Sequence, residues 1–338
     1  MELHVVGLTS TGMLFHTIRD VNRPLPLWDP WEDIIAGGAG NAGSPFLSID
    51  CAAVDNQAGV RELHVCGVTA DGRLLHTIRF GPGNWQAWGD AGGLGLADYD
   101  IERVGVAGIN GELHVCVSAI QKPTGGGETR PAIIWDLWHA IRFSNPLSWQ
   151  SFNNVNQTSA RHPNFRLPWG EIGCANVNGL LHVCAIGSDP GRPLWHTIRF
   201  PNDWQLFQDV KPTQSNNPGY SHWIGIAGIG GSLHLCLITD GGDLWHTIRI
   251  DDTHWQPFFG NVRLVVEPSR PPTFRTVSCA SVDGDLHVCA VADAGSILHT
   301  IRFSNPPDWQ RPFGDLTAVV GALGINPGGF LQVSVAGL

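Results

Sequence analysis

The stretch Ser232-Leu-His-Leu-Cys-Leu-Ile-Thr-Asp-Gly-Gly-Asp-Leu-Trp-His-Thr-Ile-Arg249, followed by Trp255-Gln256, decides the fold because its parts recur along the whole chain. The Leu-His dipeptide returns with its histidine at positions 4, 64, 114, 182, 234 and 287. Each copy is followed by His-Thr-Ile-Arg, or once by His139-Ala-Ile-Arg142. Self-similarity of this kind indicates one supersecondary unit used many times.

The spacing of these copies is typical of a β-propeller. Successive Leu-His histidines lie 60, 50, 68, 52 and 53 residues apart, and a period of about 50 suits a blade of four strands. Asn-Gly, Asp-Gly and Gly-Gly pairs separate short apolar runs, which is a hairpin signal because such turns need positive φ. We expect loop insertions in the two long steps, at residues 41–58 and 122–132. The sequence therefore predicts an all-β, six-bladed propeller with four antiparallel strands per blade.

The two chain ends predict how the ring closes. The chain ends in Val335-Ala-Gly-Leu338, which matches Val106-Ala-Gly-Ile109 at the end of a first strand, and it begins directly before a second strand. The C-terminal strand should therefore join the N-terminal blade. We expect one domain, residues 1–338, with blades at about residues 328–338 plus 1–36, 46–91, 101–155, 169–210, 222–263 and 273–318.

Composition narrows the classes of protein. Charged residues make up only 15% of the chain, the formal net charge is -10, and the basic residues do not cluster. A nucleic-acid surface needs clustered Lys and Arg, and a membrane span needs roughly 18 consecutive apolar residues. We expect no nucleic-acid partner and no membrane insertion. The N-terminus lacks the features of a signal peptide, so we expect a cytoplasmic protein or one released without such a peptide. Homo-oligomerisation stays open.

The repeated His and Arg side chains allow two interpretations. If a two-residue turn joins the second and third strands, His64 lies opposite Arg79, and His76 lies on the other face of the sheet. The pair would then either satisfy polar groups between blades or point into an inter-blade cleft and bind a polar ligand. The second interpretation makes the repeated arginines sugar-binding candidates: Arg19, Arg79, Arg142, Arg199, Arg249 and Arg302.

Two sets of tryptophans add to these candidates. One set opens the fourth strand of each copy and consists of Trp85, Trp149, Trp204, Trp255 and Trp309, whereas the first copy is degenerate, with Trp28 and Trp31. The other set precedes the third-strand histidine in three copies, as Trp138, Trp195 and Trp245. These indoles either pack between blades or present a flat face on which a sugar ring stacks.

The eight cysteines occupy two repeat positions where other copies carry Val or Ile. A buried thiol that acts as a small hydrophobe explains this exchange. Within three blades, the cysteines of the first two strands are also near enough in register for a disulfide, in the pairs Cys51/Cys66, Cys174/Cys184 and Cys279/Cys289. Free core thiols remain the simpler interpretation.

Motifs of catalysis and of metal binding are not found. The sequence has no G-x-S-x-G, no H-E-x-x-H and no carboxylate pair that breaks the repeat, although paired carboxylates carry most glycoside hydrolysis. The histidine spacing brings no three metal ligands together locally. We therefore predict a protein that is not an enzyme and has no metal and no cofactor.

The string Leu-His-Val-Cys, then Asp-Gly-x-Leu-Trp-His-Thr-Ile-Arg, then Trp-Gln, resembles the PLL-type β-propeller lectins of Photorhabdus bacteria along essentially the whole chain. That family has seven blades, whereas we count six. The resemblance implies a non-catalytic, often oligomeric protein that binds fucose or O-methylated sugars between blades. Fungal lectins of the Aleuria type share this plan with different motifs.

The leading hypothesis is therefore a multivalent lectin with glycans as partners. A propeller scaffold for protein partners, or a module associated with a toxin, is the first alternative. An unrecognised glycoside hydrolase is the second.

Overall fold

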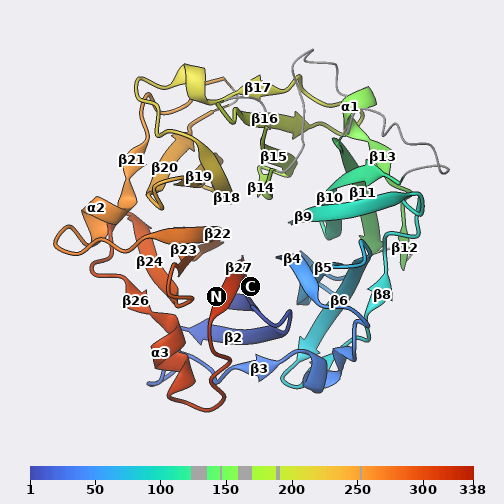
Figure 1. The fold of residues 1–338 in the computed structure, drawn as a ribbon, viewed down its shortest axis with the longest axis horizontal. Helices are drawn as coiled ribbons and strands as arrows, with labels where there is room; N and C mark the ends of the chain where they lie inside the picture. The colour runs from blue at the N-terminus through green and yellow to red at the C-terminus, as the bar shows by residue number, and fades with distance from the viewer. Residues whose placement is uncertain (123–134, 145–146, 159–169, 188–190, 252) are drawn as a thin grey trace, which may run out of the picture.

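The computed structural model describes residues 1–122, 135–144, 147–158, 170–187, 191–251 and 253–338. Six separate β-sheets stand in a ring (Figure 1), which confirms the predicted all-β propeller of six blades. Residues of their first strands line a narrow central channel. The predicted insertion at residues 122–132 lies, apart from Lys122, outside the described residues. In the part of the chain that the structure describes, no helix is long and apolar enough to cross a membrane.

The strands of each blade follow one another from the channel outward. Blade 1 consists of β27 (Phe330–Gly337), β1 (Glu2–Thr9), β2 (Leu14–Asp20) and β3 (Glu32–Asp33). Blade 2 consists of β4 (Phe46–Asp55), β5 (Arg61–Thr69), β6 (Leu74–Gly81), β7 (Asn84–Trp85) and β8 (Gly89–Asp90). Blade 3 consists of β9 (Tyr99–Ile109), β10 (Glu112–Gln121), β11 (Trp135–Ser144), β12 (Leu147–Trp149) and β13 (Asn153–Asn154).

The other three blades repeat this plan. Blade 4 consists of β14 (Ile172–Val177), β15 (Leu180–Ile186), β16 (Leu194–Arg199) and β17 (Gln208–Asp209). Blade 5 consists of β18 (Ser221–Ile229), β19 (Ser232–Thr239), β20 (Leu244–Arg249) and β21 (Gly260–Asn261). Blade 6 consists of β22 (Phe274–Val282), β23 (Asp285–Ala292), β24 (Ile297–Ser304), β25 (Pro307–Trp309) and β26 (Gly314–Asp315).

Short helical turns follow the outer strand of five blades. They are η1 (Ile35–Ala39), α1 (Val155–Thr158), η2 (Lys211–Thr213), α2 (Val262–Val266) and α3 (Leu316–Gly321). The predicted loop insertion at residues 41–58 is wrong over most of that range, because β4 occupies it. Much of the extra length of the first repeat lies in the turn of residues 56–60 between β4 and β5, whereas blades 3 to 6 join their first two strands by two residues.

The ring closes inside blade 1, as the sequence predicts. Strand β27 pairs antiparallel with β1, with Val335 opposite Val5, and the Glu2 amide donates to the Leu338 carbonyl at 2.6 Å. The two chain ends therefore lie side by side near the centre of the ring (Figure 1). The C-terminal strand β27 thus serves as the first strand of blade 1 and is hydrogen-bonded to the second strand, as the first strand is in every other blade.

The turn between the second and third strands is one residue longer than predicted. In blade 2 the Thr69 amide donates to the Arg73 carbonyl, and Gly72 has a φ of 77°. This is a three-residue turn that ends in a left-handed glycine, a common hairpin connection. His64 therefore lies opposite Ile78 and not opposite Arg79. The predicted His–Arg cross-strand pair is wrong in each blade, and His64 and His76 share one face of the sheet.

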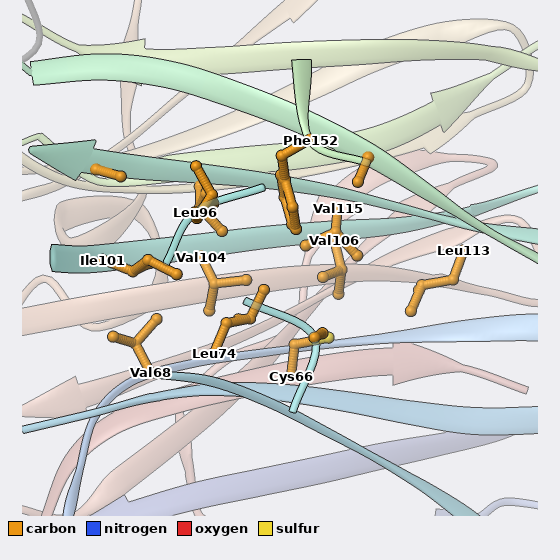
Figure 2. Close-up of a cluster of buried hydrophobic side chains, with 14 of the residues drawn as sticks. Cys66, Val68, Leu74, Leu96, Ile101, Val104, Val106, Leu113, Val115 and Phe152 are labelled. Atoms are coloured by element: carbon orange, nitrogen blue, oxygen red, sulfur yellow. The ribbon is translucent and has the colours of Figure 1, made fainter. Parts of the chain in front are cut away.

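Apolar side chains fill the space between neighbouring blades. Figure 2 shows one such cluster, in which Cys66 and Leu74 of blade 2 pack against Val106, Leu113 and Val115 of blade 3. All five of these side chains are nearly inaccessible to solvent. Their burial stabilises the fold by roughly 25 cal/mol for each Å² of apolar surface removed from water, so each blade depends on its neighbours.

The eight cysteines are all free and buried. Cys51 lies opposite Val65, and Cys66 lies opposite Asp50, so these two thiols point to opposite faces of blade 2. The disulfides considered within a blade are therefore incompatible with the register. Thiols do approach each other across blades, because Cys116 shares an apolar cluster with Cys174, as Cys236 does with Cys279.

Candidate functional site: six inter-blade clefts

A hydrogen-bonded histidine pair lies on one face of every blade. In blade 2, Nδ1 of His64 lies 3.1 Å from Nε2 of His76. The register explains the contact, because His76 lies opposite Cys66 and thus diagonal to His64 on the same face. The other five pairs have the same two atoms at 3.0–3.2 Å: His4/His16, His114/His139, His182/His196, His234/His246 and His287/His299.

The next blade faces each histidine pair with a tryptophan and an arginine. The indole of Trp149 lies edge-on to His76, with ring centroids 5.4 Å apart at 81°. Arg142 is the backbone partner of Trp149, and its charge adds to the lowering of the pKa of His76. The same ring contact, at 5.3–5.8 Å, occurs in His16/Trp85, His139/Trp204, His196/Trp255, His246/Trp309 and His299/Trp28.

These contacts define six clefts, which we number by the blade that supplies the histidines. The second cleft lies between blades 2 and 3, and the sixth lies between blades 6 and 1. The structure thus gathers the predicted arginines and the fourth-strand tryptophans into the clefts, together with the histidines of the preceding blade.

In every cleft at least one histidine of the pair is neutral at neutral pH. Burial, reinforced by an arginine of the next blade, lowers the pKa of His114, His234 and His287 to about 4. Burial lowers the pKa of His16 to about 3 and that of His76 well below its usual value. A neutral imidazole carries one N–H donor and one acceptor nitrogen.

Hydrogen bonding assigns the tautomers in the second cleft. Nε2 of His64 faces a carboxylate oxygen of Glu62 at 3.6 Å, and the equivalent Nε2 of His4 in blade 1 is hydrogen-bonded to Glu2 at 3.1 Å. Because the carboxylate accepts, His64 carries its proton on Nε2, and its Nδ1 accepts from Nε2 of His76. His76 is then left with Nδ1 as an acceptor. In the fourth cleft, Nδ1 of His196 is buried without a partner among the described residues.

The second cleft is open. A cavity of about 150 Å³ is lined there by His76, Gly89 and Asp90 of blade 2 and by Arg142, Ser148 and Trp149 of blade 3. It brings together a guanidinium donor, an imidazole acceptor and a half-buried indole. Small-molecule sites combine an apolar wall with a few placed polar groups in this way.

The first cleft is closed by a side chain of the protein itself. Glu32 accepts hydrogen bonds from Nε1 of Trp85 at 2.9 Å and from the Gly83 amide at 2.8 Å, and it lies 3.7 Å from Nε of Arg79. Trp85 is only 5% exposed, whereas the equivalent indoles of the other five clefts are half-buried. The position of Glu32, opposite the third-strand histidine, holds Gly89, Asn153, Gln208, Gly260 and Gly314 in the later blades.

The second set of predicted tryptophans lies elsewhere. Trp138 is opposite Val117 in register, on the face that carries Arg142 but near the other end of the strand. It packs against Tyr99, with ring centroids 4.8 Å apart. Trp195 is 3% exposed inside an apolar cluster, and Trp245 packs against another. The structure does not bring these three indoles to the histidine pairs.

Two site residues were missed at the level of sequence. Trp28 bridges Arg19 and contacts His299, which makes it the fourth-strand tryptophan of blade 1. The irregular segment before it hides the repeat. Glu32 had a usable signal, because it directly follows Trp31 as Gly89 directly follows Trp88. The residue after the last aromatic of the first repeat thus contributes to closing the first cleft.

Among the described residues, no group of three or more His, Cys, Asp or Glu side chains comes close enough to hold a metal ion. The repeated geometry of the clefts therefore has the character of a site for a polar organic ligand, built from hydrogen-bonding groups and indoles.

The fold defines the chain as a six-bladed β-propeller with clefts between blades. No protein-family model and no curated protein matches it. Among solved structures, an Aleuria aurantia lectin mutant in complex with Fucalpha1-6GlcNAc has a TM-score of 0.59 at 13% identity, over 93% of this chain and 91% of that chain. SapL1 lectin in complex with alpha methyl fucoside has a TM-score of 0.50 at 14% identity, over 92% and 94%.

An enzyme is also similar in fold. The Hadza microbial sialidase Hz136 has a TM-score of 0.57 at 12% identity, over 91% of this chain and 67% of that chain. At identities this low, the structural similarity shows a shared fold only, so the function has to be argued from the geometry of the clefts.

Proposed function

We propose that this chain is a multivalent carbohydrate-binding protein, a lectin, which holds a monosaccharide in the clefts between its blades. The second cleft carries the proposal. Arg142 supplies donors there, Nδ1 of His76 supplies an acceptor, and Trp149 supplies an aromatic wall around about 150 Å³ of open space. A sugar hydroxyl both donates and accepts hydrogen bonds, and the C–H face of a sugar ring packs on an indole.

Two further observations support this function. The repeated motif strings resemble those of the PLL-type lectins, for which the resemblance implies fucose and O-methylated sugars as ligands. The fold is similar to that of lectins solved with fucosides. We therefore propose a fucose-like or O-methylated sugar as the ligand class.

Repetition of the cleft gives the proposed lectin its affinity for surfaces. Several weak sites on one rigid ring raise the effective concentration of each site once one glycan is bound, so avidity can exceed single-site affinity by roughly 10²–10⁴. Glycan-coated surfaces are accordingly the proposed partners. Homo-oligomerisation would multiply the sites further.

Calorimetric titration with methyl α-L-fucoside and its O-methylated derivatives tests the proposal. We expect saturable binding with more than one site per chain. The variant Trp28→Ala/Trp149→Ala/Trp309→Ala removes the indole from the three clefts with glycine at the Glu32 position, and it should lose most binding while remaining folded by circular dichroism. No binding to these sugars or to any member of a broad glycan array would contradict a lectin and favour the protein-scaffold alternative.

We propose binding without turnover. Because a sialidase shares the fold, aryl glycosides and an aryl sialoside should be incubated with the protein. Release of the aryl alcohol above the uncatalysed rate, abolished by heat denaturation, would favour the hydrolase alternative instead.

A further inference from the structure

A cavity much larger than the clefts opens at one end of the central channel. Its volume is about 590 Å³, and its walls come from the beginnings of the first strands and the turns after the second strands of blades 5 and 6, with residues of blades 3 and 4. It shares Glu171 and Trp223 with the narrow channel. The histidine pairs and the fourth-strand indoles of the clefts do not line it. We call it the mouth cavity.

A β-bulge near the beginning of the first strand places one extra residue beside the mouth. In blade 5 the bulge residue is His222, and in blade 6 it is Arg275. Bulges re-aim a side chain and are frequent next to functional sites. The bulge itself is a feature of the repeat, because Leu47 and Leu331 occupy it in blades 2 and 1.

In two neighbouring blades the bulge residue pairs with an aspartate of the turn, whereas blade 3 has Glu102 at the bulge without such a partner among the described residues of the turn. Nε of Arg275 donates to Asp293 at 3.0 Å, and His222 contacts Asp240 at the equivalent turn position. Blade 2 carries Leu47 with Ala70 at these two positions, and blade 1 carries Leu331 with Ser10. Blades thus form without these charges, so folding does not explain them.

More polar groups converge on the same space. Arg192 lies with Nη1 3.7 Å from Oδ1 of Asp240, and Nε of Arg103 donates to Glu171 at 2.6 Å. Among the described residues, Arg275 donates a hydrogen bond only to Asp293, and it does so through Nε. Its two terminal nitrogens are therefore left to donate to a ligand. Each of the three guanidiniums thus lies near a carboxyl group, although burial raises the pKa of Glu171 to about 7 and so reduces its charge.

Between these charged groups, the wall of the mouth cavity consists of aromatic side chains and of one hydroxyl without a hydrogen-bond partner among the described residues. Trp223 is half-buried, and Phe274 is buried. Ser221 is fully buried, and its hydroxyl has no partner among the described residues. Its register position holds Phe46 and Phe330 in blades 2 and 1, so a polar group replaces a bulky apolar one at the cavity.

We propose that the mouth cavity is a second ligand-binding site, separate from the six clefts, that takes a neutral saccharide residue with neighbouring hydroxyls. Each Arg–Asp pair offers a donor beside an acceptor, which two adjacent hydroxyls can satisfy together. Trp223 provides a surface for the C–H face of the ring. Guanidiniums that already lie beside carboxyl groups favour a neutral ligand over an ion, and about 590 Å³ lies in the usual range for small-molecule sites.

The test replaces the departing residues by those of other blades. Arg275→Leu/Asp293→Ser copies blade 1, and His222→Leu/Asp240→Ala copies blade 2, so each variant keeps a pattern with which a blade folds. The probes are methyl α-glycosides of fucose, mannose, galactose and glucose, with methyl glucuronide as an acidic analogue. Calorimetry gives the number of sites, and the difference in fluorescence quenching between wild type and Trp223→Phe reports on the mouth.

We expect one neutral glycoside to quench Trp223, and each double variant to weaken that binding by roughly tenfold or more, as loss of hydrogen bonds to charged groups does. Trp149→Ala should leave it unchanged. Arg61→Leu/Asp55→Ser removes an exposed ion pair elsewhere and should also leave it unchanged.

Two results would overturn the proposal. In the first, no glycoside distinguishes wild type from Trp223→Phe or from the double variants. In the second, methyl glucuronide binds more tightly than methyl glucoside. Either result leaves binding in the clefts, measured through Trp149→Ala, as a separate question. If one double variant unfolds, glycoside binding by the other double variant and by Trp223→Phe still tests whether the mouth cavity is a binding site.

Discussion

The first and second clefts are built from the same parts, yet one is closed and the other is open. Each has a neutral histidine pair, an arginine and a tryptophan edge-on to the third-strand histidine. They differ at the strand position that holds Glu32 in blade 1 and Gly89 in blade 2, and in η1, which packs on Trp85 in the first cleft. The repeat therefore specifies the scaffold of a site, and departures from the repeat decide whether a ligand can enter it.

Glu32 behaves like a bound ligand of its own cleft. Its carboxylate accepts from the Trp85 indole and from the Gly83 amide and lies near the Arg79 guanidinium. Although burial opposes ionisation, the contacts of Glu32 with His16 and Trp85 hold the pKa of Glu32 below its usual value. A carboxylate oxygen thus occupies the place where, in the second cleft, a sugar hydroxyl would meet the same kinds of groups.

The largest expected effect is a loss of stability in acid. It should be common to the open and the closed clefts, because each cleft contains a buried neutral histidine. The pKa of His16 is about 3 and those of His114, His234 and His287 are about 4, against about 6.5 in an unfolded chain. Between these values the unfolded chain binds protons that the folded protein does not, so stability falls as pH falls. From pH 7 to pH 5 each histidine costs roughly 2 kcal/mol.

Two buried carboxyls oppose this loss. Burial raises the pKa of Asp50 to about 6 and that of Glu171 to about 7, so both carboxyls take up protons in the folded state as the pH falls. Between pH 7 and pH 5 the two together raise the free energy of unfolding by roughly 3–4 kcal/mol. The four histidines outweigh them, and the remaining cleft histidines add to the loss. Urea denaturation at pH 7 and pH 5 measures the difference. A free energy of unfolding that is unchanged or higher at pH 5 would contradict neutral histidines.

The next largest effect is a difference in stability between variants of Trp85, in the first cleft, and of Trp149, in the second cleft. Trp85→Ala removes an indole that is 5% exposed and should lower the free energy of unfolding by roughly 3–5 kcal/mol. Trp149→Ala removes a half-buried indole and should cost roughly half as much, with its main effect on sugar binding. Urea denaturation of both variants measures the costs. Equal losses of stability would mean that the second cleft is packed as tightly as the first.

The sequence was sufficient to predict the repeat, the number of blades, the strand order and the closure of the ring. Each of these depends on period and on short-range turn chemistry, as in the turn at Asn110-Gly111, whose φ angles are 51° and 80°. The pairing of His64 was wrong by one residue, because Asp71-Gly72 fits both a two-residue and a three-residue turn. A one-residue error in register changes every cross-strand partner.

The clefts were only partly predictable for a different reason. A repeat shows which residues recur, and the arginines and fourth-strand tryptophans do recur. Which blade supplies the facing side chains depends on packing between sheets, so the contact of Trp149 with His76 could not be derived from spacing. The mouth cavity depends on departures at bulges such as those at His222 and Arg275, whose shared location only the ring reveals.

The smallest expected effect comes from exchanging the residues at the strand position that holds Glu32 in blade 1 and Gly89 in blade 2. Glu32→Gly should free the donors of the first cleft and add one sugar site per chain, whereas Gly89→Glu should remove the site of the second cleft. A side chain at position 89 meets only the His76 carbonyl, at 3.9 Å, so the fold should tolerate it. Calorimetry with methyl α-L-fucoside counts the sites, and Gly93→Glu, at a glycine with open space around it, is the matched control. If Gly89→Glu leaves the number of sites unchanged, the second cleft does not bind the sugar, and the comparison between the two clefts would concern packing alone.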